Sequence, residues 1–248
     1  MGKLHISVAA EVLTHIGPLP ITNSLLTSMI VMILLFALAL WVEISPVKKG
    51  VKQIPTPILM VIEGFYNFLH GILGALTDKL FPIAFTFFLF IILGNWIGLL
   101  PGVGPIGINE SIDGEKVLIP LFRGPNADLS TTVAFALISV GVTQYFGVKA
   151  LGFKGYFQKF INFKNPMNFV LGILETIQEF SKIISFSFRL FGNIFAGEVL
   201  LTVIAFLVPF LMPVPFLALE VFVGFIQALV FTVLTAIFIA VATESAHN

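Results

Sequence analysis

The chain has 248 residues, of which 58% are hydrophobic and only 10% are charged, and its mean hydropathy is +1.05. A soluble domain is nearer half apolar and a quarter charged, so an ordinary soluble protein is excluded and a polytopic membrane protein is predicted. Thirteen basic residues balance thirteen acidic residues, so the charge indicates no nucleic-acid partner. The absence of cysteine excludes disulfides, thiolate metal sites and cysteine nucleophiles.

The first apolar block predicts a membrane span from Ser24 to Val42. A signal peptide is the alternative, but the block begins only after about two dozen residues and is followed by lysines instead of a cleavage site. The next segment, PILMVIEGFYNFLHGILGAL, carries Glu63 and His70 seven residues apart, hence on one helical face. This spacing favours an amphipathic surface helix over a metal site, since two ligands of mixed type make a poor cage.

Two further spans follow, at Pro82–Leu100 and Asp128–Phe146. The first of them ends at the Gly/Pro-rich PGVGPIGINE, and a polar loop then extends to Asn126. The second begins with ADLSTT, in which Asp128 is a favourable N-terminal cap.

Basic residues set the predicted orientation. They gather around the first and third connections between spans, at Lys48, Lys49, Lys52, Lys79, Lys149, Lys154, Lys159 and Lys164. The second connection instead has Glu110, Asp113 and Glu115 against Lys116 and Arg123. By the positive-inside rule, the N-terminus is expected outside and the C-terminus in the cytoplasm.

The last third is too long to stand upright in a bilayer. Asn165 and Pro166 begin a helix that meets no further proline until Pro209, about 43 residues or ~64 Å later. The hydrocarbon core is only ~30 Å thick. Either both final helices are strongly tilted or the first breaks at Gly192 or Gly197, and the polar spacing favours an unbroken helix.

The predicted architecture is therefore an all-α polytopic membrane protein that forms a single membrane domain, residues 1–248. Residues 1–23 form an outside N-terminal segment, residues 24–147 the first three spans, and residues 166–243 a long, strongly tilted antiparallel hairpin. This gives five spans and one amphipathic surface helix.

Polar residues in the predicted hairpin fall at three depths. Glu175, Lys182 and Arg189 are seven residues apart, as are Glu220 and Gln227. If the chain turns near Pro209, three pairs lie at equal depth: Glu175 with Glu244, Arg189 with Gln227, and Glu198 with Glu220. The midpoint of each pair falls at Val208–Pro209.

Arg189 is the hardest of these residues to explain as structural. A mid-span arginine is unfavourable by ~2.5–3.5 kcal/mol on insertion scales, and it cannot lose its charge because its pKa exceeds ~12. No carboxylate lies three or four residues away, so we expect its partner on another chain. The other polar residues keep simpler alternatives: interfacial snorkelling for Glu175, Lys182 and Glu244, and helix-to-helix hydrogen bonding for Asn193 and Gln227.

The motif FRLFGNIFAGE, preceded by LETIQEFSK and followed by FVGFIQALVFTVLTAIFIA, closely resembles subunit a of the rotary proton-translocating ATP synthase. NWIGLLP and ADLSTT extend the match, which covers most of the chain from residue 85 onward. By this resemblance, Arg189 takes the place of the essential arginine, and other polar positions of the family fall on Glu175, Asn193, Glu198, Glu220 and Gln227. The sequence departs from the family at Gly98, where some members have aspartate.

The resemblance implies a function without a catalytic centre or a cofactor. In the family, the hairpin lies against a rotating ring of small membrane subunits, each with an essential carboxylate, and a peripheral-stalk membrane subunit completes the stator. Glu198 and Glu220 would load protons from outside, Glu175 would lie on the exit path, and Gln227 would orient Arg189. Arg189 would hold the ring carboxylate deprotonated between the two half-channels.

Two other classes remain open at this stage. A self-contained proton-coupled transporter also places ionisable residues at the midplane, although it usually shows repeated halves or broken helices. An intramembrane enzyme needs a nucleophile–base pair or a metal set, and the sequence has neither HExxH nor a Gly-rich phosphate loop. A bacterial inner membrane is the expected location, since no transit peptide is evident.

Overall fold

The computed structural model describes residues 9–48, 51–52, 55–100, 107–112, 115–160, 166–208 and 211–244. The long helices are α1 (Asn23–Ile44), α2 (Thr56–Leu73), α3 (Thr77–Ile97), α4 (Leu129–Phe160), α5 (Pro166–Leu207) and α6 (Pro213–Glu244). The 3-10 turns are η1 (Gly74–Leu76) and η2 (Pro125–Ala127). Three antiparallel two-stranded hairpins pair β1 (Val12–Ile16) with β2 (Leu19–Thr22), β3 (Val47–Lys48) with β4 (Val51–Lys52), and β5 (Gly107–Ile112) with β6 (Glu115–Pro120).

Five helical segments of the described chain are long and apolar enough to cross a membrane, with α2, η1 and α3 counted as one segment. This confirms the predicted polytopic all-α fold. α1 matches the first predicted span and begins where Thr22 Oγ1 accepts a hydrogen bond from the backbone N–H of Leu25. In α2, Phe65 and Leu69 face the core, whereas Glu63 and His70 are exposed, as the amphipathic spacing predicts.

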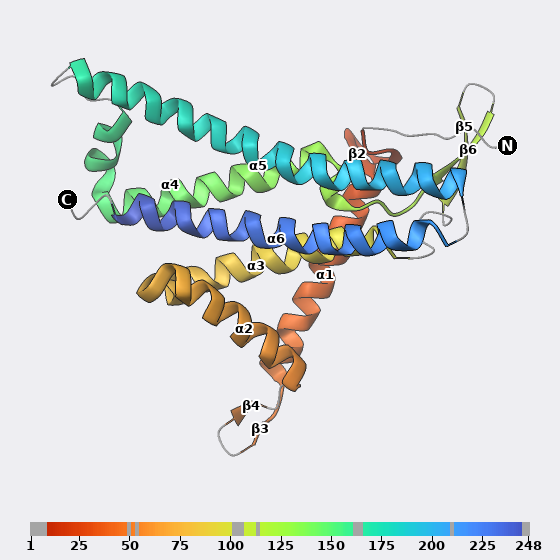
Figure 1. The fold of residues 1–248 in the computed structure, drawn as a ribbon, viewed down its shortest axis with the longest axis horizontal. Coiled ribbons are helices and arrows are strands. Elements are labelled where there is room, and N and C mark those ends of the chain that lie inside the picture. Colours follow the sequence, from red (N-terminus) through yellow and green to blue (C-terminus); the bar gives the residue numbers. More distant parts are fainter. Residues whose placement is uncertain are drawn as a thin grey trace.

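The last two helices form the expected long antiparallel hairpin (Figure 1). α5 is unbroken over 42 residues, and Gly192 and Gly197 keep a helical backbone. α3, α4, α5 and α6 lie side by side, and α1 crosses them steeply (Figure 1). Since α1 and the hairpin cross, they cannot both stand upright in one bilayer, and the length of α5 requires that the hairpin be the tilted pair.

The register of the hairpin also agrees with the sequence. The rings of Phe186 and Phe231 lie 4.9 Å apart, and Gly197 contacts the carboxyl group of Glu220. The midpoint of both pairs falls between residues 208 and 209, where the turn was predicted. Residues predicted at equal depth therefore lie at matching levels of α5 and α6.

Two helices extend beyond the predicted spans. α3 begins at Thr77, five residues before Pro82, because a proline in the second turn removes only one helical hydrogen bond while Leu80 is buried in the core. α4 continues to Phe160 instead of ending at Phe146, so Lys149, Lys154 and Lys159 lie on helix and not in a loop.

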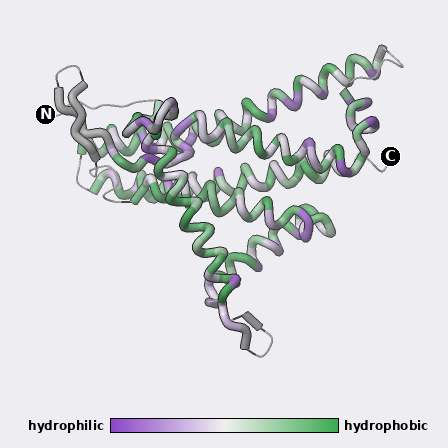
Figure 2. Tube along the Cα trace, turned by 180° about the vertical axis from the view of Figure 1, so that it is seen from behind, coloured by the Kyte–Doolittle hydropathy of each residue, from purple (hydrophilic) through white to green (hydrophobic). Residues whose placement is uncertain are grey.

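The chain reverses inside α4 at Gly152, whose φ of 72° favours glycine. Residues 153–160, which we call the α4 hook, lie at the same end of the bundle as the C-terminal end of α6 (Figure 1). The β1–β2 hairpin and the start of α6 lie towards the opposite end (Figure 1). Hydrophilic residues gather mainly near these two ends and on α2, and the helices between are largely hydrophobic (Figure 2).

Candidate functional site

Glu198 of α5 and Glu220 of α6 line one cavity of about 300 Å³. Its walls come from α3, the segment before α4, α5 and α6, and its polar lining consists of Asn95, Arg123, Glu198, Thr202 and Glu220. The antiparallel register brings the two carboxylates to the same level of the hairpin. Glu198 and Glu220 were predicted at equal depth, and their side chains line the same cavity.

A glycine makes room for the second carboxylate. Glu220 is only 6% exposed, and a Cβ added at Gly197 would lie 2.0 Å from its carboxyl carbon and both oxygens. Any side chain at position 197 would therefore displace the Glu220 carboxyl group. The adjacent residues Gly197 and Glu198 thus act together. Gly197 leaves room for the Glu220 carboxyl group of α6, and Glu198 supplies the carboxyl group of α5.

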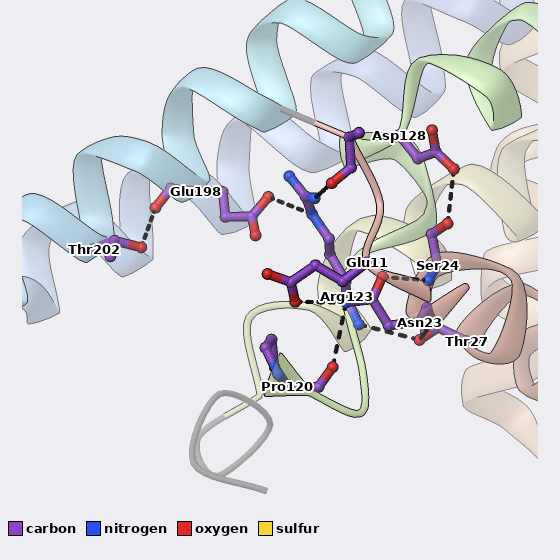
Figure 3. A network of polar contacts seen from close by, with 10 residues as sticks. Glu11, Asn23, Ser24, Thr27, Pro120, Arg123, Asp128, Glu198 and Thr202 are labelled. Carbon is purple, nitrogen blue, oxygen red and sulfur yellow. Dashed lines mark hydrogen bonds and ion pairs between the residues drawn. The ribbon is translucent and has the colours of Figure 1, made fainter. Parts of the chain in front are cut away.

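Arg123 is a site residue that the sequence analysis missed. Its side chain is 6% exposed, and its Nε donates to Glu198 Oε2 at 3.3 Å, while Nη1 donates to the carbonyl oxygen of Ala9 at 2.9 Å (Figure 3). The backbone N–H of Arg123 donates to Thr27 Oγ1 of α1 at 3.3 Å. One buried cation therefore joins the N-terminal segment, α1 and α5 at the edge of the cavity.

Neighbouring polar groups hold the same region in place (Figure 3). Asn23 Nδ2 donates to the carbonyl oxygen of Pro120 at 3.2 Å and lies 3.5 Å from Glu11 Oε2. Ser24 Oγ donates to Asp128 Oδ2 at 2.7 Å, and Asp128 Oδ1 accepts from the backbone N–H of Ser130. Asp128 thus caps α4, as predicted, and also ties it to α1.

Asn95 connects α3 to the wall of the cavity. Its Nδ2 donates to the carbonyl oxygen of Gly224 on α6 at 2.9 Å, and its Oδ1 accepts from Asn126 Nδ2 at 2.7 Å. At Gly98 an added Cβ would lie 3.1 Å from the backbone of Gly124, beside Arg123. The glycine that departs from the family pattern is therefore the point where α3 touches the loop that carries the arginine.

Arg189 and Asn193 lie outside the cavity, on an exposed face of α5. Nη2 of Arg189 donates to Ser185 Oγ at 3.0 Å. Gln227 is half-buried on α6, and within the described residues it makes no hydrogen bond to Arg189. Ser185, Arg189, Asn193 and Ala196 form an exposed stripe of small and polar side chains along α5.

Glu175 lies near the opposite end of α5, far along the helix from the cavity. Its Oε1 is 3.8 Å from Lys159 Nζ of the α4 hook, and its side chain is 33% exposed. The predicted sites therefore separate into a cavity at one end, an exposed arginine between the ends, and a carboxylate beside the hook. The side chain of Glu244, paired with Glu175 in the sequence analysis, falls outside the described residues.

Comparisons with known proteins agree on one family. The sequence profile described as "ATP synthase A chain" matches residues 25–240. Similar curated proteins include "ATP synthase subunit a" of Moorella thermoacetica, which is 35% identical over 91% of this chain and 93% of the relative. The subunit of the same name from Gloeobacter violaceus is 34% identical over 98% and 95%, and that from Enterococcus hirae is 33% identical over 91% and 94%. The chain therefore belongs to the ATP synthase A chain family, that is, to the membrane-sector subunits of the ATP synthase complex.

Proposed function

We propose that this chain is the stator subunit that provides two offset half-channels for the protons that drive ATP synthesis. The half-channels load and unload carboxylates on a rotating ring of small membrane subunits. The proposal includes a peripheral-stalk membrane subunit as a second partner and a bacterial inner membrane as the location, with the N-terminus outside and the C-terminus in the cytoplasm. The basic residues around the first and third connections support this orientation.

The single observation that carries the proposal is the cavity shared by Glu198 and Glu220. It is polar on several sides and lies at the end of the bundle assigned to the outside. Two carboxylates in one cavity are suited to pass a proton from the aqueous side towards the hairpin. Buried Arg123 donates a hydrogen bond to Glu198 at 3.3 Å and so holds that carboxylate in position at the edge of the cavity.

The exposed stripe on α5 supports the contact with the ring. Small side chains such as Ser185 and Ala196 let a second helix approach closely. Arg189 would then meet a ring carboxylate and keep it deprotonated between release and reloading. Its permanent charge would also block direct proton transfer between the half-channels, a leak driven by about 2.3 kcal/mol per charge at 100 mV. Asn193 and Gln227 would supply hydrogen bonds at this level.

The exit path is assigned to the end of α5 that carries Glu175. This carboxylate lies on the side of Arg189 opposite to the cavity, next to a lysine of the α4 hook. A proton released from the ring would reach the cytoplasm here. Because the two polar regions lie on either side of Arg189 along α5, neither forms a continuous path through the bilayer alone.

The test uses inverted vesicles that carry the whole complex, with wild type compared with Arg189→Ala. Loss of ATP-driven acidification in an assembled complex, with passive proton flow kept or raised after removal of the soluble head, is expected. Lys149→Ala is the matched control, since it removes an exposed positive charge from α4. Pumping that is unchanged in Arg189→Ala would refute the proposal.

The isolated chain distinguishes this function from that of a self-contained transporter. Reconstituted alone in liposomes, the chain should carry no proton flux above empty liposomes, because the carboxylate that crosses the membrane belongs to the ring. Flux by the purified chain would favour the transporter instead.

A further inference from the structure

A second polar network joins α4 and α5 at the end of the bundle opposite to the cavity. Its members are Gln144, Tyr156 and Lys159 of α4 and Glu175, Glu179 and Lys182 of α5. Neither the sequence motifs nor the proposed function assigns a role to Glu179. Six polar side chains that meet between two membrane helices require a reason, since such groups are costly there.

The α4 hook contributes two of the six members, Tyr156 and Lys159. After the reversal at Gly152, the ring of Tyr156 packs on Gly147, where an added Cβ would lie 2.4 Å from Tyr156 Cε2. The carbonyl oxygen of Phe160 packs on Gly172 of α5, where an added Cβ would lie only 2.2 Å away. Tyr156 is 4% exposed. Two glycines thus allow the hook to lie directly against the α4–α5 pair.

Both carboxylate oxygens of Glu179 are occupied by donors. Gln144 Nε2 donates to Oε2 at 2.8 Å, and Lys182 Nζ donates to Oε1 at 2.6 Å. Gln144 in turn accepts, through Oε1, the hydroxyl hydrogen of the buried Tyr156. Lys182 also lies over the ring of Phe238 of α6, 4.6 Å from its centre. Glu179 and its partners therefore connect the hook, α4, α5 and α6.

Glu175, one turn away, is held differently. Its Oε1 is 3.8 Å from Lys159 Nζ, beyond hydrogen-bond distance, and its buried Oε2 has no hydrogen-bond partner among the described residues. A carboxylate with an unsatisfied buried oxygen is able to take up a proton or a water, whereas a carboxylate with two charge-assisted or amide donors is already satisfied. The two neighbouring glutamates are thus arranged for different roles.

We propose that Glu179 is a positioning residue of the exit path, which holds the α4 hook closed through Gln144 and Tyr156 and so places Lys159 beside Glu175. This inference rests on the proposed function, in which Glu175 carries the proton. Glu175 exchanges protons, and Glu179 fixes the surroundings in which it does so.

The test measures ATP-driven acidification in inverted vesicles of the assembled complex, with subunit content matched by co-purification. Glu179→Gln should lower the initial rate about tenfold, as expected when hydrogen bonds to a charged group are lost. Glu179→Asp, which keeps the carboxylate, should recover most of the rate. Tyr156→Phe removes only the hydroxyl group and provides a second variant with an intact ring; it should lower the rate in the same direction.

Double variants separate a positioning role from a general structural role. If Glu179 acts through Glu175, adding Glu179→Gln to Glu175→Gln should cause less than a further twofold loss. An equal loss in both backgrounds, or no loss from Glu179→Gln alone, would overturn the inference. The proposed function fails separately: it is refuted if Arg189→Ala pumps normally, whatever Glu179 does.

Discussion

Replacement of Arg123 by methionine should loosen the N-terminal segment at the mouth of the cavity. Methionine has a similar length, so the change removes the charge and the donors with little change in volume. The side-chain hydrogen bonds lost include those to the carbonyl oxygen of Ala9 at 2.9 Å and to Glu198 at 3.3 Å.

The magnitude follows from the burial of the partners. A hydrogen bond to a charged group contributes about 1.5–3 kcal/mol to stability, and the Arg123 side chain is only 6% exposed. The Glu198 side chain is 41% exposed, so solvent weakens its bond to Arg123. We therefore expect the closed position of the N-terminal segment to lose about 2 kcal/mol, which raises the population of the open form about 30-fold.

Hydrogen–deuterium exchange of the assembled complex measures this opening. Peptides that cover residues 9–25 include the β1–β2 pairs and the Asn23 N–H that donates to the Glu11 carbonyl at 3.0 Å. Their exchange should accelerate about 30-fold in Arg123→Met and less in Arg123→Lys, which keeps the charge but loses the planar fork. Exchange in α3 serves as the internal control. Unchanged exchange in residues 9–25, or equal acceleration in α3, would refute the reasoning.

Two glycine substitutions test the close contacts of the hairpin and the hook. Gly197→Ala should displace the carboxyl group of Glu220 and lower ATP-driven pumping about tenfold without loss of assembly; Gly141→Ala, which meets no atom within 4 Å, is the matched control. Gly172→Ala should lower the melting temperature of the purified complex, because its methyl group meets the backbone carbonyl of Phe160. Overpacking of this kind costs about 1–3 kcal/mol of folding free energy. Gly155→Ala, with only an ordinary contact at 3.7 Å, should leave the melting temperature unchanged.

The helical hairpin was predictable because its determinants are local. The prolines at both ends delimit α5, its interior contains none, and Gly192 and Gly197 remain helical. The register followed from one turn position, and the contact between Gly197 and Glu220 agrees with it. The boundaries failed where local rules were weaker, since Pro82 did not begin a helix and the lysines after Phe146 did not end one.

Some residues of the site were predictable from the sequence and others were not. Glu198 and Glu220 were paired from the sequence because both lie on the same hairpin. Arg123 could not be found in this way. It lies in a loop for which the charge pattern indicated only the outer side of the membrane, and it is buried because the N-terminal segment, α1 and α5 meet around it. The predicted N-terminal cap at Asp128 was the local indication of order next to that loop.

The sequence by itself determined that this chain is a polytopic membrane protein with a tilted hairpin, because apolar length, prolines and helical spacing act within one segment. It also singled out Arg189, since a permanent charge in an apolar helix with no carboxylate one turn away is costly. Only the tertiary structure decided which polar groups meet outside the contact between the two hairpin helices. The bond of Arg123 to Glu198 and that of Glu179 to Gln144 join residues 75 and 35 positions apart. Such contacts arise when separate helices pack, and no local pattern along the chain encodes them.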